Sequence, residues 1–131
     1  MTQGAEELRG WAAARRLHGL LLRGGGVRSA EDVVATLTAI QAQEHPHARW
    51  AVGQRCSEGH RVAAEVDAAF DAGRILRTHV LRPTWHYVVP DDIRWLTRLS
   101  GPRLELAAAR RFRELGLDAK TLARAARVIA S

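Results

Sequence analysis

Apolar residues recur at helical spacing through most of the chain, and this pattern predicts a mainly helical protein. Leu17, Leu20 and Leu21 continue a first apolar stripe, which ends at three consecutive glycines, residues 24–26, because glycine disfavours a continued helix. The predicted helices cover about residues 5–22, 29–40, 46–56, 61–72, 90–99, 103–115 and 118–131.

Local start and stop signals support several of these helix boundaries. Ser29 followed by Asp32 is typical of a helix N-terminus, where a hydroxyl caps a free backbone N–H and an acid favours the positive helix end. Pro46 disfavours helical geometry at the residue before it, so the second helix is expected to end in an extended segment. The segment Ser100–Pro102 predicts a break between the fifth and sixth helices.

The apolar period changes only once, between residues 75 and 89. Residues 75–81 and 84–89 are rich in β-branched and aromatic types, and Arg82–Pro83 separates them, which predicts a β-hairpin. Helices followed by a hairpin favour a winged helix-turn-helix fold, mainly α with one hairpin as the wing. We therefore expect a winged-helix module over residues 1–92 and a helical linker over 93–131 that leads toward a further module.

Composition narrows the function classes. The chain has 20 Lys and Arg against 14 Asp and Glu, and its only lysine is Lys120. Arginine pairs well with phosphate, which suits nucleic acid, but an arginine-rich proteome explains the same bias. The single cysteine, Cys56, excludes a disulfide framework and a cysteine-rich zinc site. With no secretory signal or apolar run of membrane-spanning length, we expect a cytoplasmic, nucleoid-associated protein without membrane contact, metal or cofactor.

The hairpin segment Gly73–Asp92 resembles the central signature of a bacterial winged-helix DNA-binding family. That family includes the DNA glycosylases that excise alkylated purines and unhook interstrand crosslinks. Residues 39–43, Ala-Ile-Gln-Ala-Gln, resemble its catalytic motif of two glutamines around a hydrophobic residue, with the small Ala42 at the central position. The resemblance covers about residues 17–129 and implies that the chain is the N-terminal portion of a longer protein, docked within it onto further winged-helix modules.

Gln41 and Gln43 are the catalytic residues that this resemblance implies. Residues two apart point to the same side of an extended segment, so both amides are expected to face one cleft. A neutral amide is a poor general base, but it can hold a water beneath C1′ when the leaving base is already cationic, as in an N7-alkylated purine. Unactivated sugars need two carboxylates instead. The alternative is that both are solvent-facing glutamines at a helix end.

Hairpin and neighbouring residues are the predicted contacts to double-stranded DNA. Cations that alternate along a wing can contact the phosphate backbone, which gives a steep salt dependence. Histidines beside the glutamine motif can line the same groove, and no third or fourth partner turns them into a metal site. The predicted DNA-binding residues are Arg77, Thr78, His79, Arg82, His45 and His47. Trp85 can stack on a base or pack in the core, and packing is the more common role for a large aromatic residue in a small domain.

Three functions remain open from the sequence. The chain is part of a DNA glycosylase-like protein, a non-catalytic winged-helix DNA binder or regulator, or a structural fragment whose last helix docks on a further domain. Base excision, salt-dependent DNA binding and the oligomeric state of the isolated chain distinguish them.

Overall fold

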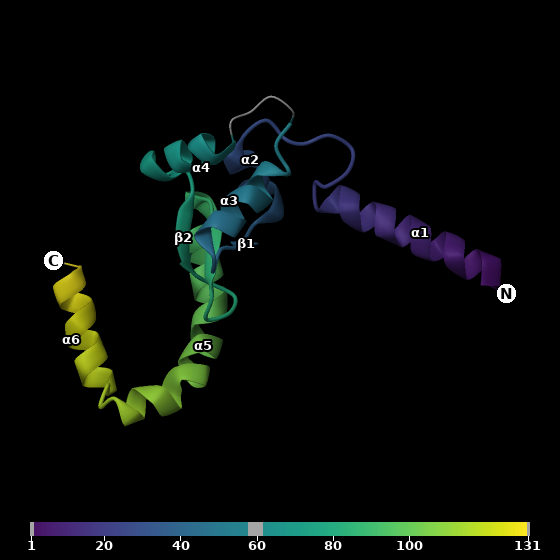
Figure 1. Ribbon diagram of the computed structural model, residues 1–131. Helices are drawn as coiled ribbons and strands as arrows, with labels where there is room; N and C mark the ends of the chain where they lie inside the picture. The colour runs from purple at the N-terminus through teal and green to yellow at the C-terminus, as the bar shows by residue number, and fades with distance from the viewer. Residues whose placement is uncertain (1, 58–61, 131) are drawn as a thin grey trace.

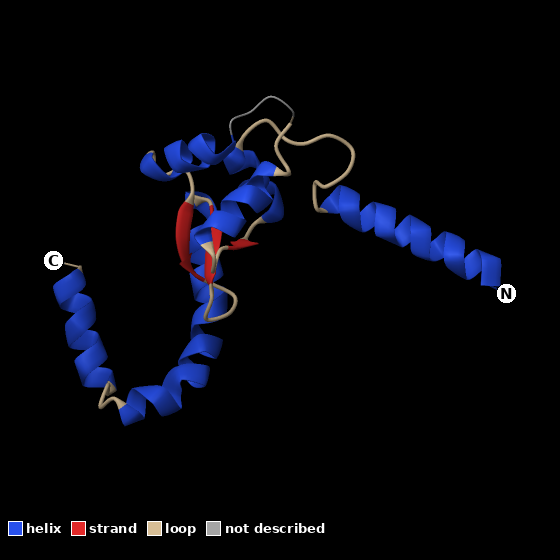
Figure 2. Ribbon diagram, in the orientation of Figure 1, coloured by secondary structure: helices blue, strands red, loops and turns tan. Residues whose placement is uncertain are grey.

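The computed structural model describes residues 2–57 and 62–130 and is mainly helical, with one small antiparallel sheet (Figures 1 and 2). The predicted mainly α class is therefore confirmed. The elements are α1 (Thr2–Gly19), α2 (Ala30–Leu37), β1 (Ile40–Gln41), α3 (His45–Gly53), α4 (Val62–Asp71), β2 (Leu76–His79), β3 (Trp85–Val88), α5 (Pro90–Glu114) and α6 (Ala119–Ile129).

The sheet has the order β1-β3-β2, and both neighbouring pairs are antiparallel. The predicted hairpin is confirmed as β2 and β3, with Thr78 opposite His86 and His79 opposite Trp85. Strand β1 adds to the far edge of β3, with Ile40 opposite Tyr87. The backbone N–H of Ala42 donates to the Trp85 carbonyl at 2.7 Å, so the extended segment continues one residue beyond β1.

Two apolar clusters lie on opposite faces of this sheet. Tyr87 and Ile75 pack with buried residues of α2, α3 and α4, whereas Val88 packs with Val80 and with Leu96 of α5. Because side chains alternate along a strand, Tyr87 and Val88 reach different clusters although they are neighbours. The central strand is therefore covered on both faces, with the short helices on one side and α5 on the other (Figure 1).

The second predicted helix is shorter than expected, and its end builds the edge strand. Ser29 caps α2 as predicted, since its Oγ accepts from the Asp32 N–H at 3.1 Å. The prediction that this helix continues to residue 40 was wrong, because α2 ends at Leu37 and Thr38 takes a φ of 66°. Pairing with β3 outweighs the helical spacing of Ile40, whose β-branched side chain suits a strand.

The predicted break at residues 100–102 was also wrong, because α5 runs unbroken through Pro102. A proline inside a helix removes one backbone bond and bends the helix, and α5 changes direction along its length (Figure 1). Buried Ser100 ties this region to the hairpin: its Oγ accepts from the Leu81 N–H at 2.7 Å and donates to the Leu96 carbonyl at 2.6 Å.

Other helix boundaries shift by a few residues. Helix α1 ends at Gly19 rather than residue 22, and its apolar stripe is not buried, with Leu8 64% and Trp11 63% exposed. Helix α3 begins at His45, so the prediction that Pro46 keeps the residue before it out of a helix was wrong: Pro46 lies in the first turn, where its missing N–H costs no helical hydrogen bond. The helix ends at Gly53, and Cys56 lies beyond it, in an isolated bridge to Val27. The turn expected at 57–59 and the expected start of the fourth helix at residue 61 lie partly or wholly outside the described residues.

The C-terminal part of the chain consists of the second half of α5 and of α6, both largely exposed. Asp118 caps α6 by accepting the Thr121 N–H at 2.7 Å, and α6 buries no residue. The division expected at residues 92 and 93 falls within α5. Both this division and docking of α6 onto a further module stay predictions.

Candidate functional site

The two glutamines flank a buried alanine on an extended segment. Ala42 is fully buried in the core beneath the sheet, while Gln41 and Gln43 are exposed. A small residue at position 42 fits this core position, since the segment lies against β3. The extended conformation that we expected after α2 is present, and Gln41 and Gln43 line one hollow.

Each glutamine oxygen is bound to the hairpin. Gln41 Oε1 accepts from Arg82 Nη2 at 3.0 Å, and Gln43 Oε1 accepts from the backbone N–H of Trp85 at 3.3 Å. A guanidinium and a backbone N–H are donors only, so the amide oxygens must face them. The amide orientations are therefore fixed: each oxygen keeps one further lone pair and each NH₂ group is left to face other partners.

Arg77 fastens the same segment from β2. Its Nε donates to the Ala42 carbonyl at 3.0 Å and its Nη2 donates to the Gln43 carbonyl at 3.1 Å. The guanidinium carbon lies 4.6 Å from the centre of the Trp85 ring, which is a cation–π contact. Arg77 is half-buried, and two of its guanidinium nitrogens donate hydrogen bonds to the glutamine segment. A DNA contact from Arg77 stays a prediction.

The remaining hairpin residues surround Trp85. The exposed His79 ring lies 4.0 Å from the Trp85 ring, centre to centre, and Thr78 is half-buried opposite buried His86. Trp85 is half-buried and belongs to neither apolar cluster. Because His79 and Arg77 lie against its ring, Trp85 is not free to stack on a base. Arg82 and His79 are the exposed cationic or titratable groups of this hairpin surface.

The two predicted histidines have different surroundings. His45 is half-buried, and its Nδ1 lies 2.7 Å from the Tyr87 hydroxyl, which also donates to the His45 carbonyl at 3.3 Å. Burial raises the pKa of Tyr87 to about 12, while Arg77 and Arg49 act in the opposite direction. The structure thus brings His45 to Tyr87 and Phe70 rather than to the hairpin surface, and its DNA contact stays a prediction. His47 is exposed beside the glutamine pair.

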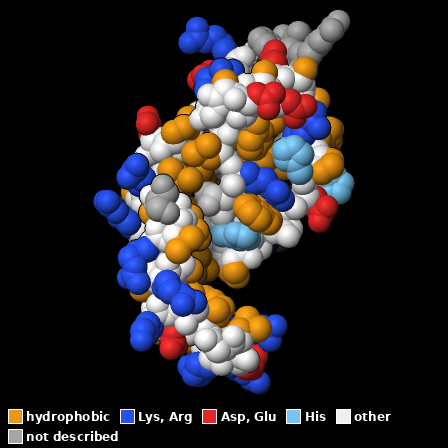
Figure 3. Space-filling model, turned by 90° about the vertical axis from the view of Figure 1, so that its left-hand side faces the viewer, with side chains coloured by type: hydrophobic (Ala, Val, Ile, Leu, Met, Phe, Trp, Pro, Cys, Tyr) orange, Lys and Arg blue, Asp and Glu red, His pale blue; other side chains and the backbone are white. Residues whose placement is uncertain are grey.

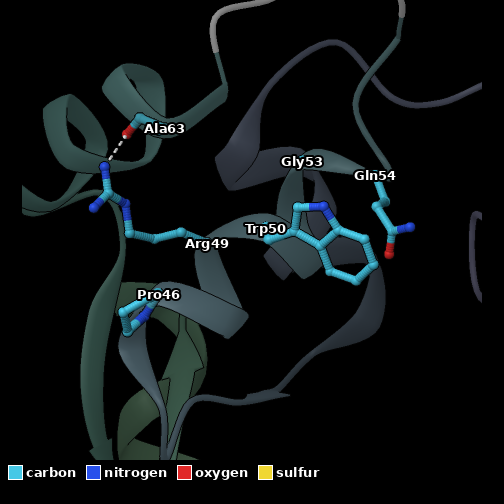
Figure 4. A pocket seen from close by; sticks show the side chains of 6 residues that line it. All are labelled: Pro46, Arg49, Trp50, Gly53, Gln54 and Ala63. Carbon is cyan, nitrogen blue, oxygen red and sulfur yellow. Dashed lines mark hydrogen bonds between the residues drawn. The ribbon is translucent and has the colours of Figure 1, made fainter.

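A hollow of about 450 Å³ lies beside the glutamine pair. It is lined by Gln41, Gln43, Glu44, His47, Ala48, Trp50 and Ala51. Trp50 is 67% exposed and also borders a second hollow of about 410 Å³, which Figure 4 shows. Arg49 extends from α3 toward the Ala63 carbonyl, whereas the Trp50 indole extends to the other side, near Gln54 (Figure 4).

Trp50 was not predicted as a site residue, because its position within the predicted third helix suggested a place in the core. The buried positions of α3 are Ala48 and Val52, one helical turn apart. Residue 50 lies between them in sequence and therefore on the opposite side of the helix. That offset was the available signal that Trp50 is outside the core.

Comparison with protein families shows which family the chain belongs to. The family model described as DNA glycosylase AlkZ-like matches residues 34–131, which include the glutamine segment, the hairpin and both long C-terminal helices. The chain belongs to the AlkZ-like DNA glycosylase family. No curated protein and no solved structure matches the chain. The match confirms the resemblance to a DNA glycosylase family, and DNA is the partner that membership in this AlkZ-like family implies.

Charge is unevenly distributed over this AlkZ-like family member. In Figure 3, Lys and Arg side chains gather in the lower part of the molecule, at the level of the second half of α5 and of α6. Helix α4, in contrast, contains Glu65, Asp67 and Asp71 and no basic residue. Asp67 is paired with Arg49 of α3 at 2.6 Å.

The described residues contain neither a metal-binding cluster nor a membrane-spanning helix. Within residues 2–57 and 62–130, no group of three His, Cys, Asp or Glu is arranged to hold a metal ion. Of the helices described, none combines the length and apolar character needed to cross a membrane.

Burial raises the pKa of the half-buried Cys56 thiol, whose Sγ lies 3.6 Å from the Val52 carbonyl, so the thiol is less reactive than an ordinary exposed cysteine.

Proposed function

We propose that this chain binds double-stranded DNA as a winged-helix module and supplies Gln41 and Gln43 for hydrolysis of the N-glycosidic bond of a cationic, alkylated purine. Family membership supports the glycosylase class. The order α2-β1-α3-α4-β2-β3, with sheet order β1-β3-β2, supports the winged-helix assignment, since a helix and a strand precede two helices and a closing hairpin.

The observation that carries the proposal is the attachment of both amide oxygens to the hairpin. Because Arg82 binds Gln41 and the Trp85 N–H binds Gln43, the wing and the glutamine pair form one unit. DNA that contacts the exposed His79 and Arg82 therefore passes the glutamine pair at a fixed distance. Such a preorganised site orients a water without reorganising during the reaction.

The reaction requires a purine that is already positively charged, because such a base leaves without being protonated first. The bond from C1′ to the purine nitrogen breaks, and its electron pair neutralises the positive charge of the alkylated base. A water held by an amide oxygen adds to C1′, and its proton passes to solvent. The products are an abasic sugar and a neutral alkylpurine. A neutral nucleoside lacks this leaving group, and an amide pair offers no acid to protonate it.

An excision assay tests the catalytic part. Duplex DNA with a single N7-methylguanine is incubated with the chain, and abasic sites are cleaved and counted. Gln41→Ala combined with Gln43→Ala is expected to lower the single-turnover rate about 10²-fold, because the water loses its orientation. Gln54→Ala is the matched control, an exposed glutamine at the end of α3. Equal rates for wild type and the double variant would contradict the role of the pair.

DNA affinity at two salt concentrations tests the wing separately. Log affinity falls with log salt by about 0.9 per phosphate contact, so Arg82→Ala is expected to reduce this slope by about one. Salt-dependent binding without excision would favour a non-catalytic DNA binder. Affinity that does not change with salt would contradict the wing itself.

A further inference from the structure

Trp50 presents a large apolar surface next to the glutamine pair. Its side chain is 67% exposed, although a tryptophan is usually kept from water in a small domain. The side chain lines the same hollow as Gln41 and Gln43, and it projects away from Arg49 and α4 (Figure 4). The hollow, at about 450 Å³, lies within the range of about 300–1,000 Å³ that small-molecule sites occupy.

The charge of this hollow differs from that of the chain. The chain has a net charge of +6. Among the seven described residues that line the hollow, however, Glu44 is the one with a formal charge, and there is neither Lys nor Arg. Arg82 binds the Gln41 side-chain oxygen and Arg77 binds the Gln43 carbonyl, but neither arginine lines the hollow. Glu44 makes no side-chain capping bond to α3, so its exposed carboxylate is not engaged at the helix end.

The exposed indole of Trp50 and the carboxylate of Glu44 together favour a planar, positively charged ligand. An indole face attracts a positive charge through its quadrupole, and tryptophan does so better than other aromatic residues. The Glu44 carboxylate beside the indole also attracts a positive charge, and the two glutamine amides can form hydrogen bonds to the edge of a base. Trp85 is less suited to this role, because His79 and Arg77 already lie against its ring.

We propose that Trp50 and Glu44 form the recognition site for the positively charged base, with the indole stacked on the base and the carboxylate facing its charge. This inference rests on the proposed function and names the residues that distinguish a cationic lesion from a neutral purine. Gln41 and Gln43 act at the sugar, and Trp50 and Glu44 act at the base.

A binding experiment that needs no catalysis tests the recognition site. 7-Methylguanosine and guanosine are titrated into the chain at mildly acidic pH, and the backbone amide resonances of β1 and α3 are followed by NMR. Wild type is expected to prefer the cationic nucleoside by about two- to fivefold through stacking on Trp50. Trp50→Ala should remove this preference and Trp50→Phe should keep part of it. Glu44→Gln should lower it by about twofold.

Trp11→Ala is the matched control, because Trp11 is similarly exposed (63%) but lies on α1. It is expected to keep the full preference. An unchanged preference in Trp50→Ala, or equal affinity of wild type for the two nucleosides, would overturn the proposal even where excision and salt-dependent DNA binding occur. Conversely, loss of preference in Trp50→Ala with no excision by wild type would support the recognition site and refute the catalytic function.

Discussion

Arg77 is expected to hold the glutamine segment in place, and its replacement by alanine measures how strongly. The change removes two hydrogen bonds from a charged donor to the Ala42 and Gln43 carbonyls, and one cation–π contact with Trp85. Each hydrogen bond contributes about 1 kcal/mol net, less where exposed, and a cation–π contact at an open site adds about 0.5 kcal/mol. Arg77→Ala should therefore lower the free energy of unfolding by roughly 2 kcal/mol.

Urea and thermal unfolding, followed by circular dichroism, check this value. A loss of that size corresponds to a decrease in Tm of about 6–10 °C for a domain of this length. Arg82→Ala is the control, since Arg82 is exposed and its hydrogen bond to Gln41 joins two exposed side chains. It should change the stability by less than about 0.5 kcal/mol. If Arg77→Ala leaves Tm unchanged and instead lowers the salt slope of DNA binding by one, Arg77 is a phosphate contact and the reasoning is refuted.

Three further predictions concern packing and capping. Tyr87→Phe should lower the free energy of unfolding by about 1–3 kcal/mol in urea, because it leaves the half-buried His45 Nδ1 without its partner. The Tyr87 pKa near 12 means that the folded state favours the neutral phenol, so this stabilisation is complete below pH 10 and is lost toward pH 12. Tyr87 is the only tyrosine, so the ultraviolet absorbance of tyrosinate follows it directly, and titration near 10 would contradict the burial argument. Ser29→Ala should cost about 1 kcal/mol in thermal unfolding through loss of the α2 cap, whereas Ser29→Asp should retain most of it. Ser100→Ala should cost about 1–2 kcal/mol and speed amide hydrogen exchange at Leu81, whose N–H loses its acceptor; unchanged exchange there would show that the hairpin does not depend on this bond.

The sequence predicted the features that depend on neighbouring residues. Ser29 and Asp32 are three residues apart, so their capping contact follows from local chemistry. The hairpin followed from a change of period together with a turn at Arg82–Pro83, and β2 and β3 lie inside the predicted ranges. An extended segment at the end of the second helix was expected and Gln41 lies in strand β1, but the reason given was wrong, because His45, the residue before Pro46, is helical.

Features that depend on distant partners were not predicted. Ile40 fits a helical stripe by spacing, and only pairing with Tyr87, far along the chain, makes it a strand residue. Pro102 signals a break locally, but packing of Leu96 and Ser100 against the hairpin keeps α5 continuous. The bonds from Arg77 to the glutamine segment span more than thirty residues, and no local pattern specifies them.

The acidic helix α4 has a consequence for how a polyanion meets this protein. Glu65, Asp67 and Asp71 lie on α4, with Asp67 paired to Arg49, whereas the charged side chains of the hairpin are Arg77 and Arg82. A molecule with such a charge asymmetry experiences a torque in the field of a nucleic acid, and unfavourable approaches are rejected before contact. If the duplex binds the hairpin surface as proposed, the carboxylates of α4 disfavour approach from that helix, and neutralising them should slow association more than it changes dissociation.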